Sequence, residues 1–228
     1  MIDRYQPPTV PWLTVLHHDR DLLVVDKPSG LLSVPGRQDG WQDSALLRAR
    51  RDHTPIYDVH RLDMDTSGVL VMALRRKAEA ALKGQFEART IAKSYLARVH
   101  GQPPDSGLIE LPLSRIGGLP PRNEVDMVAG KPAITHYRVL ARGPRAALLL
   151  LEPRTGRSHQ LRVHLAAIGH PILGDPLYAP APVAAASPRL LLHAWRLALD
   201  HPFSGQRLHL EAPPPVPDLI PPGESGGR

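Results

Sequence analysis

Residues 60–68 read His-Arg-Leu-Asp-Met-Asp-Thr-Ser-Gly, and residues 69–74 continue as Val-Leu-Val-Met-Ala-Leu. The second segment is an apolar run with the length of a buried strand, and a Thr-Ser-Gly turn precedes it. Asp63 therefore stands at the edge of an element, where a cleft can form. A half-buried carboxylate needs a cationic partner there to stay ionised. A lone Asp before a turn more often binds backbone amides, so a catalytic role for Asp63 depends on a partner elsewhere in the chain.

Arg162 is the candidate partner, about 100 residues further along the chain. The spacing of apolar residues predicts a helix over 159–168, with Gly169 just beyond its end. Arg162 lies one position off the apolar stripe of this helix. From the helix alone, two interpretations stay open: a surface arginine whose stem packs on apolar neighbours, or a forked donor to Asp63.

Asp65 and Tyr95 are the other candidates for chemistry. In an extended segment Asp63 and Asp65 point to opposite faces, so they do not form the pair of carboxylates that a glycosidase needs. Tyr95 is one of only five tyrosines. Its ring either packs in the core or stacks on an RNA base that has left its helix.

The 12 histidines do not predict a metal site. His159 and His164 are five positions apart and do not share a helical face as residues four apart would, and the adjacent His17 and His18 diverge. The chain also has no phosphate-binding loop and no dinucleotide-binding motif. We therefore expect no metal and no cofactor, and a reaction carried out by side chains alone.

Composition indicates a polyanionic partner. The 228 residues carry a formal net charge of +6, and 42% of them are hydrophobic, enough for a sizeable core. The absence of cysteine excludes disulfides and thiolate chemistry. The N-terminus has no apolar segment of the kind found in signal peptides, so we expect a cytoplasmic protein without membrane contact.

Strand patterns outnumber helix patterns and often follow one another directly, which favours an α+β fold with a mixed, mainly antiparallel central sheet, flanking helices and a cleft. We expect one domain over 1–212 and an unstructured Pro/Gly-rich tail over 213–228. The expected strands lie at 22–26, 69–74, 94–99, 108–113, 133–140, 146–152, 190–199 and 207–210. The expected helices lie at 44–52, 77–88 and 159–168, and 114–132 is expected to be an exposed loop or hairpin arm.

Three blocks of sequence resemble the RluA family of pseudouridine synthases. They are residues 60–68, residues 156–165 with their continuation to 179, and residues 27–36. The blocks occur in the family's order, and the resemblance runs from about residue 10 to residue 212. The segment 114–129 departs most from the family. We also expect no N-terminal S4 domain of the kind that many relatives carry.

The resemblance implies a pseudouridine synthase fold and an enzyme that isomerises uridine in structured RNA. It implies that Asp63 is the catalytic aspartate, Tyr95 the active-site tyrosine and Arg162 the arginine that pairs with the aspartate. The expected partners are the anticodon stem-loop of tRNA, at uridine 32, and a hairpin of 23S rRNA, at uridine 746. A monomer is expected. The residues expected to bind the substrate are His60, Arg61, Thr66, Arg154, Arg157, His159 and Leu161.

Three alternatives remain open at this point. A relative of the same family that modifies another tRNA or rRNA uridine would have the same site. A noncatalytic RNA-binding protein would not need Asp63 and Arg162 together. A nucleoside hydrolase would release free uracil. Nor does the sequence decide whether Asp63 acts as a nucleophile at C1′ or as a base that removes a proton from the sugar.

Overall fold

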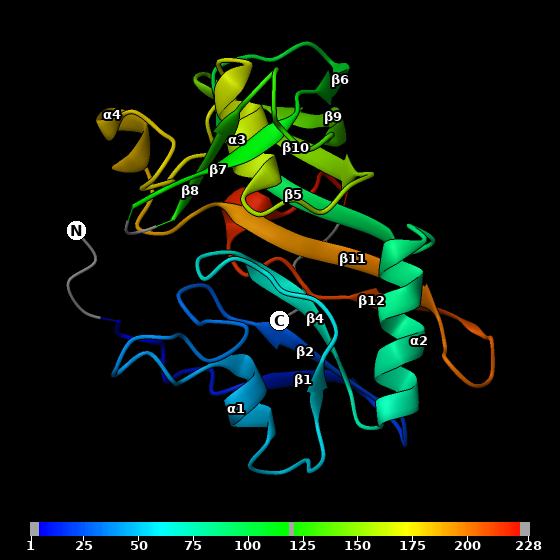
Figure 1. The fold of residues 1–228 in the computed structure, drawn as a ribbon. Helices are drawn as coiled ribbons and strands as arrows, with labels where there is room; N and C mark the ends of the chain where they lie inside the picture. The colour runs from blue at the N-terminus through cyan, green and yellow to red at the C-terminus, as the bar shows by residue number, and fades with distance from the viewer. Residues whose placement is uncertain (1–4, 119–120, 224–228) are drawn as a thin grey trace. The chain divides into compact units, whose positions relative to one another are not determined.

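The computed structural model describes residues 5–118 and 121–223, and these divide into two compact units (Figure 1). One unit, here the Asp63 unit, contains residues 5–93 and 194–213. The other, here the Arg162 unit, contains residues 94–193 and 214–223. Asp63 thus belongs to one unit, and Tyr95 and Arg162 belong to the other.

The Asp63 unit is built on antiparallel strands. β2 (Leu22–Lys27) pairs with both β1 (Thr14–His18) and β4 (Ser67–Ala73), and the short β3 (Tyr57–Asp58) also pairs with β4. β12 (Arg207–Glu211) pairs with β11 (Leu192–Asp200). Every residue of β4 is buried, as the apolar run had indicated. The main core cluster of this unit is built largely from β2, β4, α2 and the β11–β12 pair.

The Asp63 unit also contains two helices, of which the first is blue and the second cyan-green in Figure 1. α1 (Ala45–Ala49) begins after Ser44, whose side-chain oxygen accepts a hydrogen bond from the Leu47 amide. This is the N-cap that a serine at that position provides. α2 (Arg76–Glu87) buries Ala78 and Leu82, two positions of the apolar stripe that predicted it, and it contacts β3 and β4.

The Arg162 unit has an antiparallel order of β5 (Ala92–His100), β10 (Ala146–Pro153), β9 (Ile134–Arg142) and β6 (Ser106–Glu110). A separate hairpin, β7 (Leu113–Ile116) with β8 (Arg122–Val125), lies where the exposed arm was expected. Its helices are α3 (Gln160–Ala167) and the short α4 (Ala181–Ala184). The α+β fold with a mainly antiparallel sheet is thereby confirmed.

Some elements were not anticipated. β1 and α4 lie in segments where no strand or helix was expected. The expected tail contains the 3-10 helix Pro217–Leu219, in which Leu219 is fully buried, and its residues 224–228 lie outside the described part of the chain. Among the described residues, no helix combines the length and the apolar character that crossing a membrane requires.

Candidate active site

Asp63 is half-buried on a loop whose backbone is fixed on both sides. On one side, the Ser33 hydroxyl donates to the Leu62 carbonyl at 2.8 Å and accepts from the Leu62 amide at 3.0 Å. On the other side, the Gly30 amide donates to the Met64 carbonyl at 3.0 Å. The loop that carries the candidate carboxylate is therefore pinned to the segment that follows β2.

Lys27 is the central anchor of this arrangement. Its side chain is fully buried, and its ammonium donates to the carbonyls of Pro28, Leu31 and Met64 at 2.9, 2.6 and 2.8 Å. The Ser29 hydroxyl adds a hydrogen bond to the Asp65 carbonyl at 2.7 Å. Residues 27–36, one of the three family blocks, thus support the loop of another block, residues 60–68.

His60 supports the same loop and does not act as a cation. Its ring stacks on Phe86 with centroids 4.7 Å apart, and the Val71 amide donates to its Nε2 at 3.0 Å. Burial, with a smaller effect from the positive charge of Lys93, lowers the pKa of His60 to about 3. The imidazole is therefore neutral at neutral pH, with its only ring proton on Nδ1.

The remaining expected residues of this loop differ in exposure. Arg61 is exposed, so its guanidinium can reach a phosphate. Thr66 is 2% exposed, and its hydroxyl is buried with no hydrogen-bond partner in the described structure. The Thr66 amide donates to the Asp63 carbonyl at 3.2 Å, which closes the turn into β4.

Arg162 is buried on α3 and is held by a carboxylate that sequence reasoning did not identify. Its Nε and Nη2 donate to Oδ2 and Oδ1 of Asp175 at 2.8 and 2.6 Å, and the two side chains are 2% and 1% exposed. The sequence offered one signal for this contact, an aspartate after Gly174 in the third block, but its spacing from Arg162 does not reveal the pairing. The interpretation of Arg162 as a surface arginine was wrong.

The ring of Tyr178 packs against the guanidinium of Arg162. The Arg162 guanidinium carbon lies 5.1 Å from the centre of the Tyr178 ring. The Tyr178 hydroxyl lies 2.6 Å from His159 Nδ1 and accepts a hydrogen bond from the Asn123 amide of β8 at 2.9 Å. His159 has a positive φ of 54° directly before α3. One tyrosine thus links the β7–β8 hairpin to the start of the helix that carries Arg162.

A buried polar network fixes the first turn of α3 to β9. The Gln160 amide group donates to Ile134 O and Thr135 Oγ1, both at 3.0 Å, while its oxygen accepts from Thr155 Oγ1 at 2.8 Å. His164 Nδ1 lies 3.0 Å from the Thr135 hydroxyl, and burial lowers the pKa of His164. These contacts determine where α3 begins.

The other expected residues of the Arg162 unit lie on β5 and along residues 154–161. Tyr95 is half-buried on β5 and is paired in register with Leu151 of β10. Leu161 is buried, Arg154 is exposed, and Arg157 is half-buried with its Nε donating to the Pro132 carbonyl at 3.2 Å. Arg154 and Arg157 can therefore present positive charge beside the start of α3.

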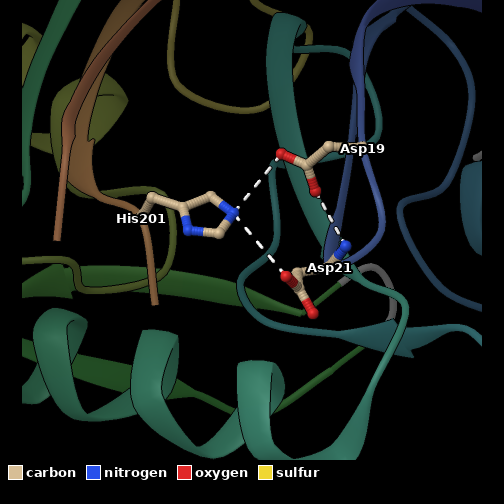
Figure 2. Close-up of side chains that lie close together, drawn as sticks. All are labelled: Asp19, Asp21 and His201. Atoms are coloured by element: carbon tan, nitrogen blue, oxygen red, sulfur yellow. Dashed lines mark hydrogen bonds and ion pairs between the residues drawn. The ribbon is translucent and has the colours of Figure 1, made fainter. Parts of the chain in front are cut away.

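Asp19, Asp21 and His201 form the one group within the described ranges whose atoms lie close enough to hold a metal ion (Figure 2). Hydrogen bonds and an ion pair within the protein already engage the carboxylate oxygens of this group. Asp19 Oδ1 accepts from the amides of Asp21 and Leu22, and Asp21 Oδ1 accepts from Arg75.

The protonation of His201 also argues against a metal. Its Nδ1 accepts from the amides of Phe203 and Ser204, which places a proton on Nε2, 3.4 Å from Asp19 Oδ2. Burial opposes ionisation of Asp19, but the hydrogen bonds from His17 and two backbone amides outweigh it and hold the pKa of Asp19 below its usual value. The group is a hydrogen-bonded cluster, joined by the Arg75–Asp21 ion pair, that links the β1–β2 turn to the β11–β12 turn, and no sequence pattern had indicated it.

Comparison with known proteins identifies the family. Residues 21–167 match the family described as RNA pseudouridylate synthase. The chain is 49% identical over 214 residues to the dual-specificity RNA pseudouridine synthase RluA of Escherichia coli (strain K12), covering 93% of this chain and 98% of that protein. It is 48% identical over 212 residues to the protein of the same name from Pasteurella multocida (strain Pm70), covering 92% and 97%.

A solved structure agrees with this result. Human RNA Pseudouridylate Synthase Domain Containing 1 superposes with a TM-score of 0.78 at 30% sequence identity, covering 94% of this chain and 89% of that one. The expected pseudouridine synthase fold is confirmed. Fold and sequence together place the chain in the RNA pseudouridylate synthase family, as an enzyme that isomerises uridine in RNA.

Proposed function

We propose that the chain modifies two RNAs, the anticodon stem-loop of tRNA at uridine 32 and a hairpin of 23S rRNA at uridine 746. The supporting observation is that relatives 48% to 50% identical over nearly their whole length are named dual-specificity enzymes. The net charge of +6 suits a polyanionic substrate. We further propose that the enzyme acts as a monomer in the cytoplasm, where these RNAs are made.

We propose that Asp63 is the catalytic carboxylate. The observation that carries this assignment is the set of hydrogen bonds that fixes Leu62 and Met64, the residues on either side of it. Backbone support of this kind favours the fixed geometry that a catalytic carboxylate requires. In the reaction the N1–C1′ bond of uridine breaks, the uracil turns, and C5 bonds to C1′. C5 then loses its proton and N1 gains one, so no oxidant or phosphate donor is consumed.

Asp63 begins the reaction either as a nucleophile at C1′ or as a base that removes a proton from the sugar. Arg162 pairs with Asp63 and keeps it ionised and oriented. Tyr95 packs on the uracil, and its hydroxyl stands ready to assist loss of the C5 proton. Both roles rest on family resemblance and on the buried or half-buried positions of the two side chains.

The target uridine must leave its stack to reach Asp63, which costs a few kcal/mol. Arg61, Arg154 and Arg157 would supply phosphate contacts that offset this cost, since the first two are exposed and the third is half-buried. The ring of His60 is neutral, so its expected contact with the RNA would be a hydrogen bond and not a charge interaction.

The experiment that tests the target uses unmodified transcripts of the tRNA anticodon stem-loop and of the 23S rRNA hairpin. Carbodiimide-dependent stops of reverse transcription report pseudouridine at single-nucleotide resolution. We expect stops that mark uridine 32 and uridine 746. Transcripts with cytidine at these positions are the matched controls. Modification at another uridine would replace this target with the alternative of a related site, and release of free uracil would indicate a hydrolase.

A further inference from the structure

The Arg162–Asp175 contact is a buried ion pair with two hydrogen bonds. Both oxygens of Asp175 accept from the Nε edge of the guanidinium, at 2.8 and 2.6 Å. A two-point contact of this kind fixes the plane of the guanidinium as well as its position. Both side chains are at most 2% exposed, so water does not compete for these hydrogen bonds.

Asp175 is itself held in place by the backbone. Its Oδ1 also accepts from the amides of Leu177 and Tyr178, at 2.9 and 3.2 Å. The preceding Gly174 has φ +76°, and a Cβ at this position would lie 1.9 Å from the Arg189 carbonyl oxygen. The turn that carries Asp175 is therefore closely packed, and the carboxylate cannot follow a moving guanidinium.

The ring of Tyr178 restricts Arg162 from another direction. It lies 5.1 Å from the guanidinium carbon, and hydrogen bonds to His159 and Asn123 fix its hydroxyl. An arginine with one edge held by a carboxylate and a ring over the group has a single orientation. Because a guanidinium carries five N–H donors, the edge formed by its two terminal nitrogens is directed away from Asp175.

We propose that Asp175 is a positioning residue, which fixes the position and the plane of the Arg162 guanidinium for its role in the reaction. The inference rests on the proposed roles of Asp63 and Arg162 and extends them by one residue. Asp175 also supplies a negative charge that compensates the buried guanidinium. Arg162 can therefore stay in place while other groups change their charge or their bonding during the reaction.

The test is a double-mutant cycle with Asp175→Asn and Arg162→Met. The Asn variant keeps an oxygen for the two backbone amides but removes the charge and one acceptor of the fork. A misplacement of about 1 Å can cost about 100-fold in rate, so we expect kcat to fall by about 100-fold with KM for RNA unchanged. Because Asp175 acts through Arg162, the double variant should turn over no more slowly than Arg162→Met alone.

Stability separates positioning from a purely structural role. Each single variant leaves a buried group without its partner, whereas the double variant removes both charges and should unfold later than either single variant. We expect stability to recover in the double variant while turnover does not. A matched control is Asp105→Asn, which removes the carboxylate partner of another arginine of this unit, Arg142, at the surface, and which should leave kcat near wild type.

Two results would overturn the inference: normal kcat in folded Asp175→Asn, or recovery of turnover together with stability in the double variant. Normal kcat in Arg162→Met would instead remove the proposed role of Arg162. A failure of the inference alone is thus distinguished from a failure of the proposed site.

Discussion

At the scale of single residues, Lys27 connects a buried charge to the placement of the loop that carries Asp63. A fully buried ammonium is costly unless each of its donors is used, and the carbonyls of Pro28, Leu31 and Met64 use them. The Met64 carbonyl is one residue from Asp63. Any loosening of Lys27 is therefore transmitted to the carboxylate.

Lys27→Met should lower the free energy of unfolding by about 1–3 kcal/mol, because it removes these hydrogen bonds and leaves the Leu31 carbonyl buried. Urea unfolding measures this change. Lys83→Met is the matched control, since Lys83 makes a surface pair with Glu79 at 2.8 Å and should change stability by less than about 0.5 kcal/mol. Equal effects of the two changes would contradict the role given to Lys27.

His60 gives a prediction about pH. Its pKa is lowered to about 3 in the folded chain from an ordinary value of 6.5, so the unfolded chain takes up the proton first. The stabilisation is complete above pH 6.5 and is lost as pH falls from there toward the folded value. One such group lowers the free energy of unfolding by up to about 1.4 kcal/mol per pH unit in this window.

Urea unfolding at several pH values between these limits measures the slope. His60→Gln is the control, because a Gln oxygen can accept from the Val71 amide but does not titrate. This variant should show a shallower fall of stability with acid than the wild type. Identical slopes would mean that His60 is not the group responsible.

At the scale of elements, Gly68 at the start of β4 shows how closely backbones approach near the site. It has φ +113°, and a Cβ there would lie 2.1 Å from the Ala194 carbonyl oxygen. The block that carries Asp63 ends in this glycine because no other residue fits there. A change at this position displaces a strand and not merely a side chain.

Gly68→Ala should therefore cost more than about 3 kcal/mol and reduce the yield of folded protein, since both the clash and the positive φ are unfavourable. Gly84→Ala is the matched control. Gly84 lies in α2 with open space around it, so alanine should stabilise the chain by about 0.5–1 kcal/mol. Thermal unfolding of the two variants gives the comparison, and a tolerated Gly68→Ala would contradict this account of β4.

The success of sequence reasoning at this scale depended on local signals. α1 and α2 were predicted from an N-cap serine and an apolar stripe, and β4 from its unbroken apolar run. β1 was missed because its residues are exposed or half-buried and it forms only by pairing with β2. Alternation and apolar runs do not signal a strand of that kind.

Only part of the candidate site could be predicted from the sequence. The family blocks contain Asp63 and Arg162, and the resemblance as a whole implied Tyr95. Asp175, Lys27 and the supporting role of His60 were not predicted, because each depends on a contact between segments distant in the sequence. Tertiary packing brings Asp175 to Arg162, and no rule of sequence spacing predicts this pairing.

At the scale of the whole molecule, the net charge of +6 gives a prediction about RNA binding. If phosphate contacts dominate, the association constant should fall by at least about 10-fold between about 50 and 200 mM salt. Arg154→Gln should reduce the slope of this dependence by about 1, as expected for one lost phosphate contact. Arg142→Gln is the control, since Arg142 is paired with Asp105 at 2.6 Å. Affinity that does not respond to salt would contradict an electrostatic interface.

The central claim is that one carboxylate, Asp63, carries out the isomerisation. The most direct measurement is pseudouridine formation by Asp63→Asn on the tRNA and rRNA transcripts, with RNA binding measured in parallel. Asparagine has nearly the same shape and leaves the hydrogen bonds of Leu62 and Met64 in place, so we predict wild-type binding and no detectable pseudouridine. Turnover near that of the wild type in this variant would contradict the account.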